Sequence, residues 1–130
     1  MSARSPNPGG ASIAEALDHR QRNGRPVRVG LVGAGQMGTD ILVQTGLMQG
    51  IEVVAAADAI RENVFSACKI AGDGGRAPEL ADDAAATAQA ISRGHLAVCG
   101  SFRDVCNAEG ADVIIDATGN PNVGAEVALT

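Results

Sequence analysis

The stretch VRVGLVGAGQMGT, residues 27–39, decides the fold class of this chain. It is an apolar run that ends in a glycine-rich turn, in which Gly33, Gly35 and Gly38 have the spacing GxGxxG. A helical pattern follows, and the next apolar run ends at Asp58, 20 residues after Gly38. A lone GxGxxG carries little weight. A strand before it, a helix after it and an acidic residue at this distance are together typical of a dinucleotide-binding βαβ unit.

Each residue of the turn has a physical role in this interpretation. Gly33 permits the tight turn, Gly35 lets a pyrophosphate approach the main chain because it has no Cβ atom, and Gly38 allows the helix to pack closely on the sheet. The free N–H groups of Gln36 and Met37, with the helix dipole, favour a phosphate. The alternative is that the glycines only form a sharp corner between strand and helix. The combined features favour dinucleotide binding.

Two charged residues bear on the choice of cofactor. Asp58 is placed to accept hydrogen bonds from an adenosine ribose, and its charge would repel a 2′-phosphate, which favours NAD. Arg61 can neutralise that phosphate, because a guanidinium binds phosphate well. It can equally be a solvated residue in the first turn of a helix. The sequence therefore leaves NAD and NADP open.

A second candidate segment, DATGNP, spans residues 116–121 at the end of a later apolar run. In open α/β sheets, ligands bind outside the carboxyl ends of the strands. Thr118 and Gly119 are therefore expected to contact the pyrophosphate and the nicotinamide ribose. The alternative is a turn that only leads into the next helix, and both interpretations can hold together.

Apolar periodicity and glycine stops predict the other elements. We expect helices over residues 13–23, 36–49, 61–71 and 78–93, a brief one after Ser101, and one from residue 122. Strands are expected at 27–32, 51–57, 96–99 and 112–116. This alternation predicts an α/β fold, a Rossmann-type parallel sheet with helices on both faces, incomplete at about four strands. The strand at 112–116 is expected at an edge of the sheet, where it would favour self-association.

The 130 residues suit one domain with a short extension. We expect residues 1–11 to be a disordered arm, because they are rich in Pro, Gly and Ser, and residues 12–25 to be a leader helix and linker. Residues 26–130 form the expected dinucleotide-binding domain.

Composition excludes several classes of protein. Ten Lys and Arg against fifteen Asp and Glu give a net charge of −5, which argues against a nucleic-acid-binding domain. The longest uncharged runs, 29–39 and 41–51, are too short to span a bilayer. Three cysteines without CxxC spacing favour a reduced, cytoplasmic setting. His95, Cys99 and Cys106 do not form a standard ligand set, so no metal site is predicted.

Three segments carry a resemblance to a known family: NGRPVRVGLVGAGQMGTDI (23–41), VVAAAD (53–58) and ADVIIDATGNPNVGAEVAL (111–129). They resemble the N-terminal cofactor domain of homoserine-dehydrogenase-type oxidoreductases. The chain is most similar to the SAF-domain-containing oxidoreductases related to DXR-like (1-deoxy-D-xylulose 5-phosphate reductoisomerase-like) reductases. The resemblance implies an NAD(P)H-dependent, cytoplasmic, homo-oligomeric reductase or dehydrogenase. The cofactor contacts it implies are Gly33, Gly35, Gln36, Met37, Gly38, Asp58, Thr118 and Gly119.

The chain differs from that family in length. Members have further strands and a catalytic domain, so we expect a domain truncated before these parts, and we assign no catalytic residue. The expected reaction is hydride transfer between nicotinamide and a small polar carbonyl or alcohol, with the small-molecule substrate bound by a downstream domain. The alternative is a stand-alone nucleotide-sensing regulatory module without catalysis, since the fold alone supports both.

Overall fold

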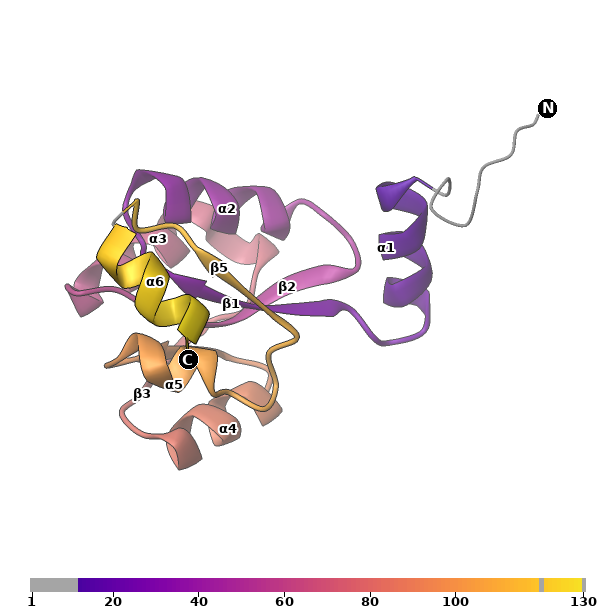
Figure 1. Ribbon diagram of the computed structural model, residues 1–130. Helices are drawn as coiled ribbons and strands as arrows, with labels where there is room; N and C mark the ends of the chain where they lie inside the picture. Colours follow the sequence, from indigo (N-terminus) through magenta and orange to yellow (C-terminus); the bar gives the residue numbers. More distant parts are fainter. Residues whose placement is uncertain (1–11, 120, 130) are drawn as a thin grey trace.

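A single parallel sheet organises the computed structural model, which describes residues 12–119 and 121–129 (Figure 1). The strands are β1 (Val27–Val32), β2 (Ile51–Ala57), β3 (Pro78–Ala81), β4 (Leu96–Cys99) and β5 (Val113–Asp116). The helices are α1 (Ile13–Arg22), α2 (Gln36–Gly46), α3 (Arg61–Ala71), α4 (Ala84–Ser92), α5 (Phe102–Cys106) and α6 (Pro121–Leu129), with a 3-10 turn η1 (Gly72–Gly74). The fold is α/β, as predicted.

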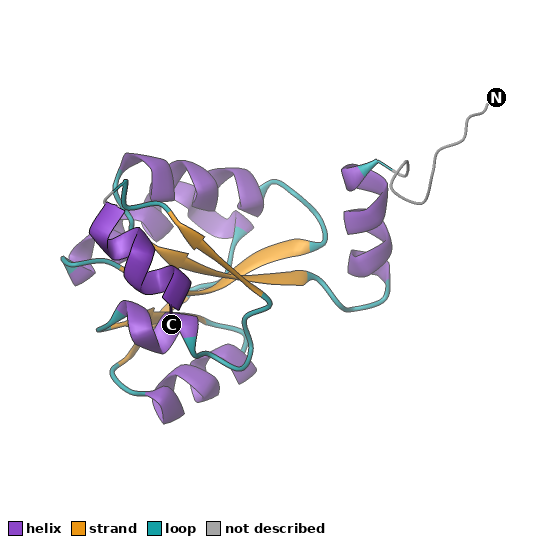
Figure 2. Cartoon of the chain, in the orientation of Figure 1, coloured by secondary structure: helices purple, strands orange, loops and turns teal. Residues whose placement is uncertain are grey.

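The five strands lie in the order β3-β4-β2-β1-β5, and every neighbouring pair is parallel. Helices cover both faces, with α2 and α3 on one side and α4 and α5 on the other (Figures 1 and 2). Alternate residues of a strand face opposite sides, so Leu31 belongs to the core under α2 and α3, whereas Val32 belongs to the core under α4 and α5. The whole of β4 is buried, as expected for a parallel strand covered on both faces.

The predicted leader helix is present as α1 and stands apart from the sheet (Figure 1). Ser12 caps it by accepting a hydrogen bond from the N–H of Glu15 at 3.0 Å, and none of its residues is buried. It meets the sheet at Gly50, whose N–H donates to the side-chain oxygen of Gln21 at 2.8 Å. Residues 1–11, for which we predicted a disordered arm, lie outside the described residues.

The predicted helix over 78–93 is wrong in its first third. Residues Pro78–Ala81 form the edge strand β3, and α4 begins only at Ala84, where Asp83 caps it by accepting from the N–H of Ala86 at 2.7 Å. The sheet therefore has five strands rather than four. Pro78 suits the first position of a helix, but it suits the first position of an edge strand equally well, because neither position needs its missing N–H.

The helix α2 also ends earlier than predicted, at Gly46 rather than at residue 49. The N–H groups of Leu47 and Met48 donate to carbonyls three residues back, so the chain closes in a tight turn. Gly46 packs against Gly74 of η1, and a Cβ atom at residue 46 would lie 3.3 Å from the Gly74 carbonyl carbon. This contact between two glycines fixes the end of the helix. Met48, which lies beyond the end of α2, is 44% exposed.

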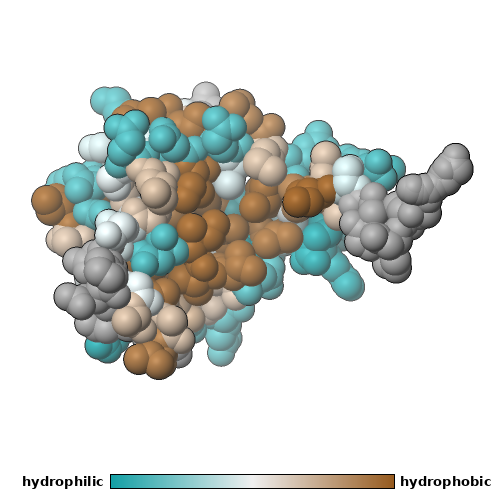
Figure 3. Space-filling model, turned by 45° about the horizontal axis from the view of Figure 1, so that its top comes forward, coloured by the Kyte–Doolittle hydropathy of each residue, from teal (hydrophilic) through white to brown (hydrophobic). Residues whose placement is uncertain are grey.

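The strand β5 lies at an edge of the described sheet, as predicted, and pairs only with β1. Its residues are half-buried or exposed, in contrast to β4, and Val113 is 45% exposed. Apolar side chains gather near the middle of the face seen in Figure 3, bordered by hydrophilic ones. In the described residues, no helix has both the length and the apolar character needed to cross a membrane.

Candidate functional site

A cavity of about 670 Å³ lies where four strands end. Its wall comes from the turns that follow the carboxyl ends of β1, β2, β4 and β5, which a parallel sheet brings to one edge. The lining residues are Val32, Gly33, Gly35, Gln36, Met37, Ala57, Asp58, Ala59, Gly100, Ser101, Phe102, Ala117, Thr118 and Gly119. Seven of the nine predicted site residues belong to this set. The other two, Gly38 and Arg61, lie outside it.

Two glycines of the turn are required by the fold itself. Gly33 has a φ angle of +99°, in the region that favours glycine, and a Cβ atom there would lie 3.0 Å from the backbone nitrogen of Thr118. Its N–H donates to the carbonyl of Ala57 at 2.8 Å, which ties the turn to the end of β2. A Cβ atom at Gly38 would lie 2.0 Å from the carbonyl oxygen of Gly33. These residues therefore set the turn and the approach of α2.

Gly35, the N-cap of α2, is different, because no contact with the described residues requires its side chain to be absent. Its φ angle is −76°, and apart from its two chain neighbours no described atom lies within 4 Å of the position that a Cβ atom would take. That open space belongs to the cavity. Within residues 12–119 and 121–129, the N–H groups of Gly35, Gln36 and Met37 have no hydrogen-bond acceptor. Unpaired donors at the start of a helix, with room for an atom close to the main chain, suit an anionic oxygen.

Asp58 is held in a fixed orientation on the cavity wall. One carboxylate oxygen accepts from the N–H of Ala34 at 2.9 Å, and the other accepts from the N–H of Ile60 at 3.0 Å and the side-chain amide of Asn63 at 2.8 Å. Partial burial opposes ionisation, but these three hydrogen bonds outweigh it and lower the pKa of Asp58. The group is an ionised carboxylate at neutral pH. Since a carboxylate offers about four acceptor positions, one is left for a ligand hydroxyl.

Arg61 does not line the cavity but lies just behind its wall. Its guanidinium forms an ion pair with Asp82, at 2.8 Å between Nη2 and Oδ1. The same Nη2 lies 2.7 Å from the position of a Cβ atom on Gly100, which is a lining residue. The two side chains are 38% and 65% exposed, respectively. The sequence could not show this ion pair, because Asp82 lies in a separate loop before α4.

The DATGNP segment both turns and lines the cavity. The N–H and the hydroxyl of Thr118 donate to one carboxylate oxygen of Asp116, at 2.9 and 2.6 Å. Gly119 has a φ angle of +68°, and both Thr118 and Gly119 face the cavity. The segment is therefore a turn before α6 whose residues Thr118 and Gly119 also line the cavity, so the two interpretations are compatible. Asn120 lies outside the described residues.

Sequence reasoning missed one wall of the cavity, formed by Gly100, Ser101 and Phe102 after β4. Ser101 was predicted only as the cap of a brief helix, and it does cap α5 by accepting from the N–H of Arg103 at 3.1 Å. The signal that could have found this wall is topological. All strands of a parallel sheet end at the same edge, so the residues after the buried run LAVC had to lie beside Asp58.

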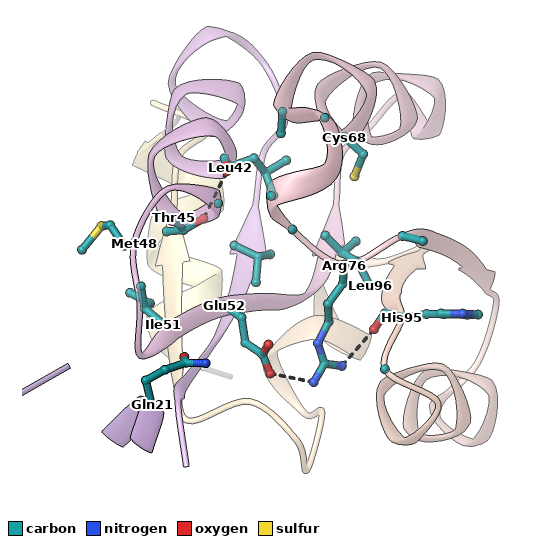
Figure 4. A pocket seen from close by; sticks show the side chains of 18 residues that line it. Gln21, Leu42, Thr45, Met48, Ile51, Glu52, Cys68, Arg76, His95 and Leu96 are labelled. Carbon is teal, nitrogen blue, oxygen red and sulfur yellow. Dashed lines mark hydrogen bonds and ion pairs between the residues drawn. The ribbon is translucent and has the colours of Figure 1, made fainter. Parts of the chain in front are cut away.

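A second cavity, of about 440 Å³, lies at the opposite edge of the sheet, around the amino ends of β2 and β4 (Figure 4). Arg76 crosses it, donating to Glu52 at 2.6 Å and to the carbonyls of Ile91 and His95 at 2.9 and 3.1 Å. Thr45 donates its hydroxyl to the carbonyl of Ile41 at 2.9 Å. The Arg76 and Thr45 side chains thus have partners in the chain, and we regard this cavity as the weaker candidate for binding.

Of the residues considered for a metal site, Cys99 belongs to an apolar core cluster and Cys106 packs against it, whereas His95 lies before β4. Cys99 is fully buried in the core, where burial raises the pKa of its thiol. His95 contacts the carboxylate of Glu79 through Nδ1 at the amino end of β4. In the described part of the chain, no three His, Cys, Asp or Glu side chains converge as metal ligands do.

Comparisons with known proteins identify no family for this chain. No protein-family model matches it, and a search of curated proteins finds no similar sequence. The fold and the cavity define an α/β protein with a five-stranded parallel sheet and a glycine-rich turn in the cavity at the carboxyl ends of its strands. The resemblance to homoserine-dehydrogenase-type oxidoreductases remains a prediction.

Proposed function

We propose that this chain binds a nicotinamide dinucleotide, NAD or NADP, and is the cofactor-binding portion of an oxidoreductase that acts on a small polar carbonyl or alcohol. The observation that carries the proposal is Gly35. The described residues leave open space where its side chain would be, and they provide no acceptor for the three neighbouring N–H groups. We interpret this open position as the place where another molecule approaches the main chain.

The cavity fits the parts of a dinucleotide. A pyrophosphate suits the amino end of α2, where Gly35, Gln36 and Met37 offer N–H donors and the helix dipole favours negative charge. The hydroxyls of an adenosine ribose suit the fixed carboxylate of Asp58, which retains acceptor capacity. Thr118 lies on the wall that follows β5, where its hydroxyl oxygen can accept a hydrogen bond from the second half of the ligand.

The residues of this chain would bind and orient, whereas the nicotinamide ring itself supplies or accepts the hydride. The internal hydrogen bonds of Asp58 and Thr118 hold these groups in place before a ligand arrives, so little ordering is needed on binding. Asp58 also fixes the glycine turn, because it accepts from the N–H of Ala34 inside that turn. One carboxylate thus connects the glycine turn to the place that we propose for the adenosine ribose.

The test is titration calorimetry of the whole chain with NADH and with NADPH. A methyl group at residue 35 would enter the space that we assign to the pyrophosphate, so Gly35→Ala should weaken binding about tenfold or more, the loss expected for displaced hydrogen bonds of ~1–3 kcal/mol. Its melting temperature should stay close to that of the wild type, since among the described residues only the two chain neighbours come within 4 Å of the added methyl group.

The matched control is Gly75→Ala. Gly75 also has a negative φ angle, −115°, and open space at its Cβ position, but it lines the other cavity. This variant should bind both dinucleotides like the wild type. Equal affinities of the Gly35→Ala variant and the wild type would overturn the site. Failure of the wild type to bind either dinucleotide would overturn the proposed function.

A further inference from the structure

We infer that Asp82 makes the proposed site prefer NAD to NADP, because it holds Arg61 in an ion pair behind the cavity wall. The inference rests on the proposed function and names a positioning residue for it. Asp82 does not line the cavity and has no counterpart in the glycine motif. It acts through Arg61, the cation that lies nearest along the chain to Asp58.

The charges around the expected adenosine ribose favour a neutral ligand group. Asp58 is ionised, Arg61 is positive and Asp82 is negative, so the three side chains sum to one negative charge. A 2′-hydroxyl brings no charge to this corner. A 2′-phosphate, like other phosphate monoesters, carries about −1.5 to −2 at neutral pH. Its binding therefore requires the guanidinium of Arg61 to be available.

Arg61 is close enough to the cavity to matter. Its Nη2 atom lies 2.7 Å from the Cβ position of Gly100, on the wall beside Asp58, and Asp82 Oδ1 lies 4.0 Å from the same point. The carboxylate thus competes for the Nη2 donor that lies next to the wall residue Gly100. A guanidinium binds a phosphate best through two parallel N–H groups, and one of these is already directed to Asp82.

Replacing this carboxylate should change the selectivity and leave the rest of the site intact. Asp82→Asn keeps the size of the side chain but removes its charge, so Arg61 becomes free to pair with a 2′-phosphate. We expect the affinity for NADPH to rise roughly three- to tenfold, a modest gain because partly exposed ion pairs are weak. The affinity for NADH should stay the same.

A double-mutant cycle assigns the effect to the pair. Arg61→Ala alone should weaken NADPH binding more than NADH binding, and Asp82→Asn should give no gain when Arg61 is already alanine. Asp82→Glu keeps the charge and should retain the wild-type ratio of affinities. The gain of Asp82→Asn should shrink in high salt, whereas a merely structural effect would not depend on salt in this way.

Calorimetry with both dinucleotides separates the inference from the proposed function. A wild type that prefers NADPH, or an Asp82→Asn variant whose NADPH-to-NADH affinity ratio is unchanged, would overturn the role of Asp82 while NADH binding still supports the site. If the wild type binds neither dinucleotide, the proposed function itself fails. Melting temperatures measured beside the titrations show that each variant is folded.

Discussion

The two cavities lie at opposite ends of the parallel strands, and they differ in whether their hydrogen-bond donors have partners in the chain. At the carboxyl ends of the strands, the N–H groups that begin α2 have no acceptor in the described chain, and Gly35 leaves space beside them. At the amino ends, the guanidinium of Arg76 donates hydrogen bonds to Glu52 and to two carbonyls. A polar group that is paired inside the chain stabilises the fold, whereas one that is left open is available to a ligand.

The difference follows from the geometry of a parallel sheet. Each helix begins near the carboxyl end of the strand that precedes it, so unpaired N–H donors collect at the carboxyl ends of the strands. Helices end near the opposite edge, where unpaired carbonyls collect instead. Arg76 is suited to that edge, because its guanidinium can donate to the carbonyls of Ile91 and His95 at once. Cavity volume alone would not separate the two sites.

The largest expected effect is at Gly38. A methyl group there would lie 2.0 Å from the carbonyl oxygen of Gly33, so the main chain of the turn must move. We expect Gly38→Ala to lower the free energy of unfolding by about 3 kcal/mol or more, beyond the usual range for overpacking, because a rigid backbone atom is in the way. Urea unfolding checks this. Gly35→Ala, in the same turn, should unfold like the wild type, and equal losses for the two variants would contradict the separate roles of these glycines.

Removing the hydrogen bonds of Arg76 in the other cavity should lower the free energy of unfolding and leave the affinity for NADH unchanged. Arg76→Met keeps much of the side-chain volume but removes all three interactions of a guanidinium that is only 12% exposed. The loss should be about 2–3 kcal/mol, because two carbonyls and a carboxylate lose their donor. Glu52→Gln, which leaves a neutral acceptor for Arg76, should cost less. Calorimetry should show that both variants bind NADH with the wild-type affinity. A variant that stays folded but binds NADH more weakly would show that the ligand occupies the cavity around Arg76.

How far the sequence predicts this molecule depends on burial. The strands at residues 27–32, 51–57 and 96–99 were predicted with the bounds that the structure has, because strands covered on both faces are continuous apolar runs. The exposed edge strand β3 has no such run, and Leu80 in it is 48% exposed, so the pattern was mistaken for a helix. The glycine turn was predictable from spacing. The ion pair of Arg61 was not, because no local pattern relates it to Asp82.

A smaller effect is expected at Asp58, and it depends on pH. Its hydrogen bonds lower the pKa of the folded state, so the stabilisation is complete above the ordinary aspartate pKa of about 4 and is lost as the pH falls through the lower folded-state value. Asp58→Asn should therefore lower the free energy of unfolding by about 1–2 kcal/mol at pH 7. The difference from the wild type should shrink below about pH 4. Thermal unfolding across this range measures it, and a constant difference at all pH values would show that the charge of Asp58 does not stabilise the turn.

The smallest effect on stability is expected at the two edge strands, β3 and β5, which differ in their capacity to pair with a further strand. At one edge, β3 begins with Pro78, which has no N–H to offer a further strand, whereas β5 at the other edge consists of VIID and has no proline. Self-association should therefore use β5, next to the proposed binding cavity. Val113→Lys places a charge on this edge at a residue that is 45% exposed, so unfolding should change by less than about 0.5 kcal/mol.

Sedimentation at increasing protein concentration should show a wild type that associates and a Val113→Lys variant that associates less, because a lysine on an edge strand opposes pairing with a second copy. Leu80→Lys is the matched control on β3, where a residue of similar exposure, 48%, lies on the edge that begins with Pro78. Equal reductions by the two substitutions would mean that added charge, and not the β5 edge, governs association. A wild type that stays monomeric at every concentration would show that β5 needs no further strand.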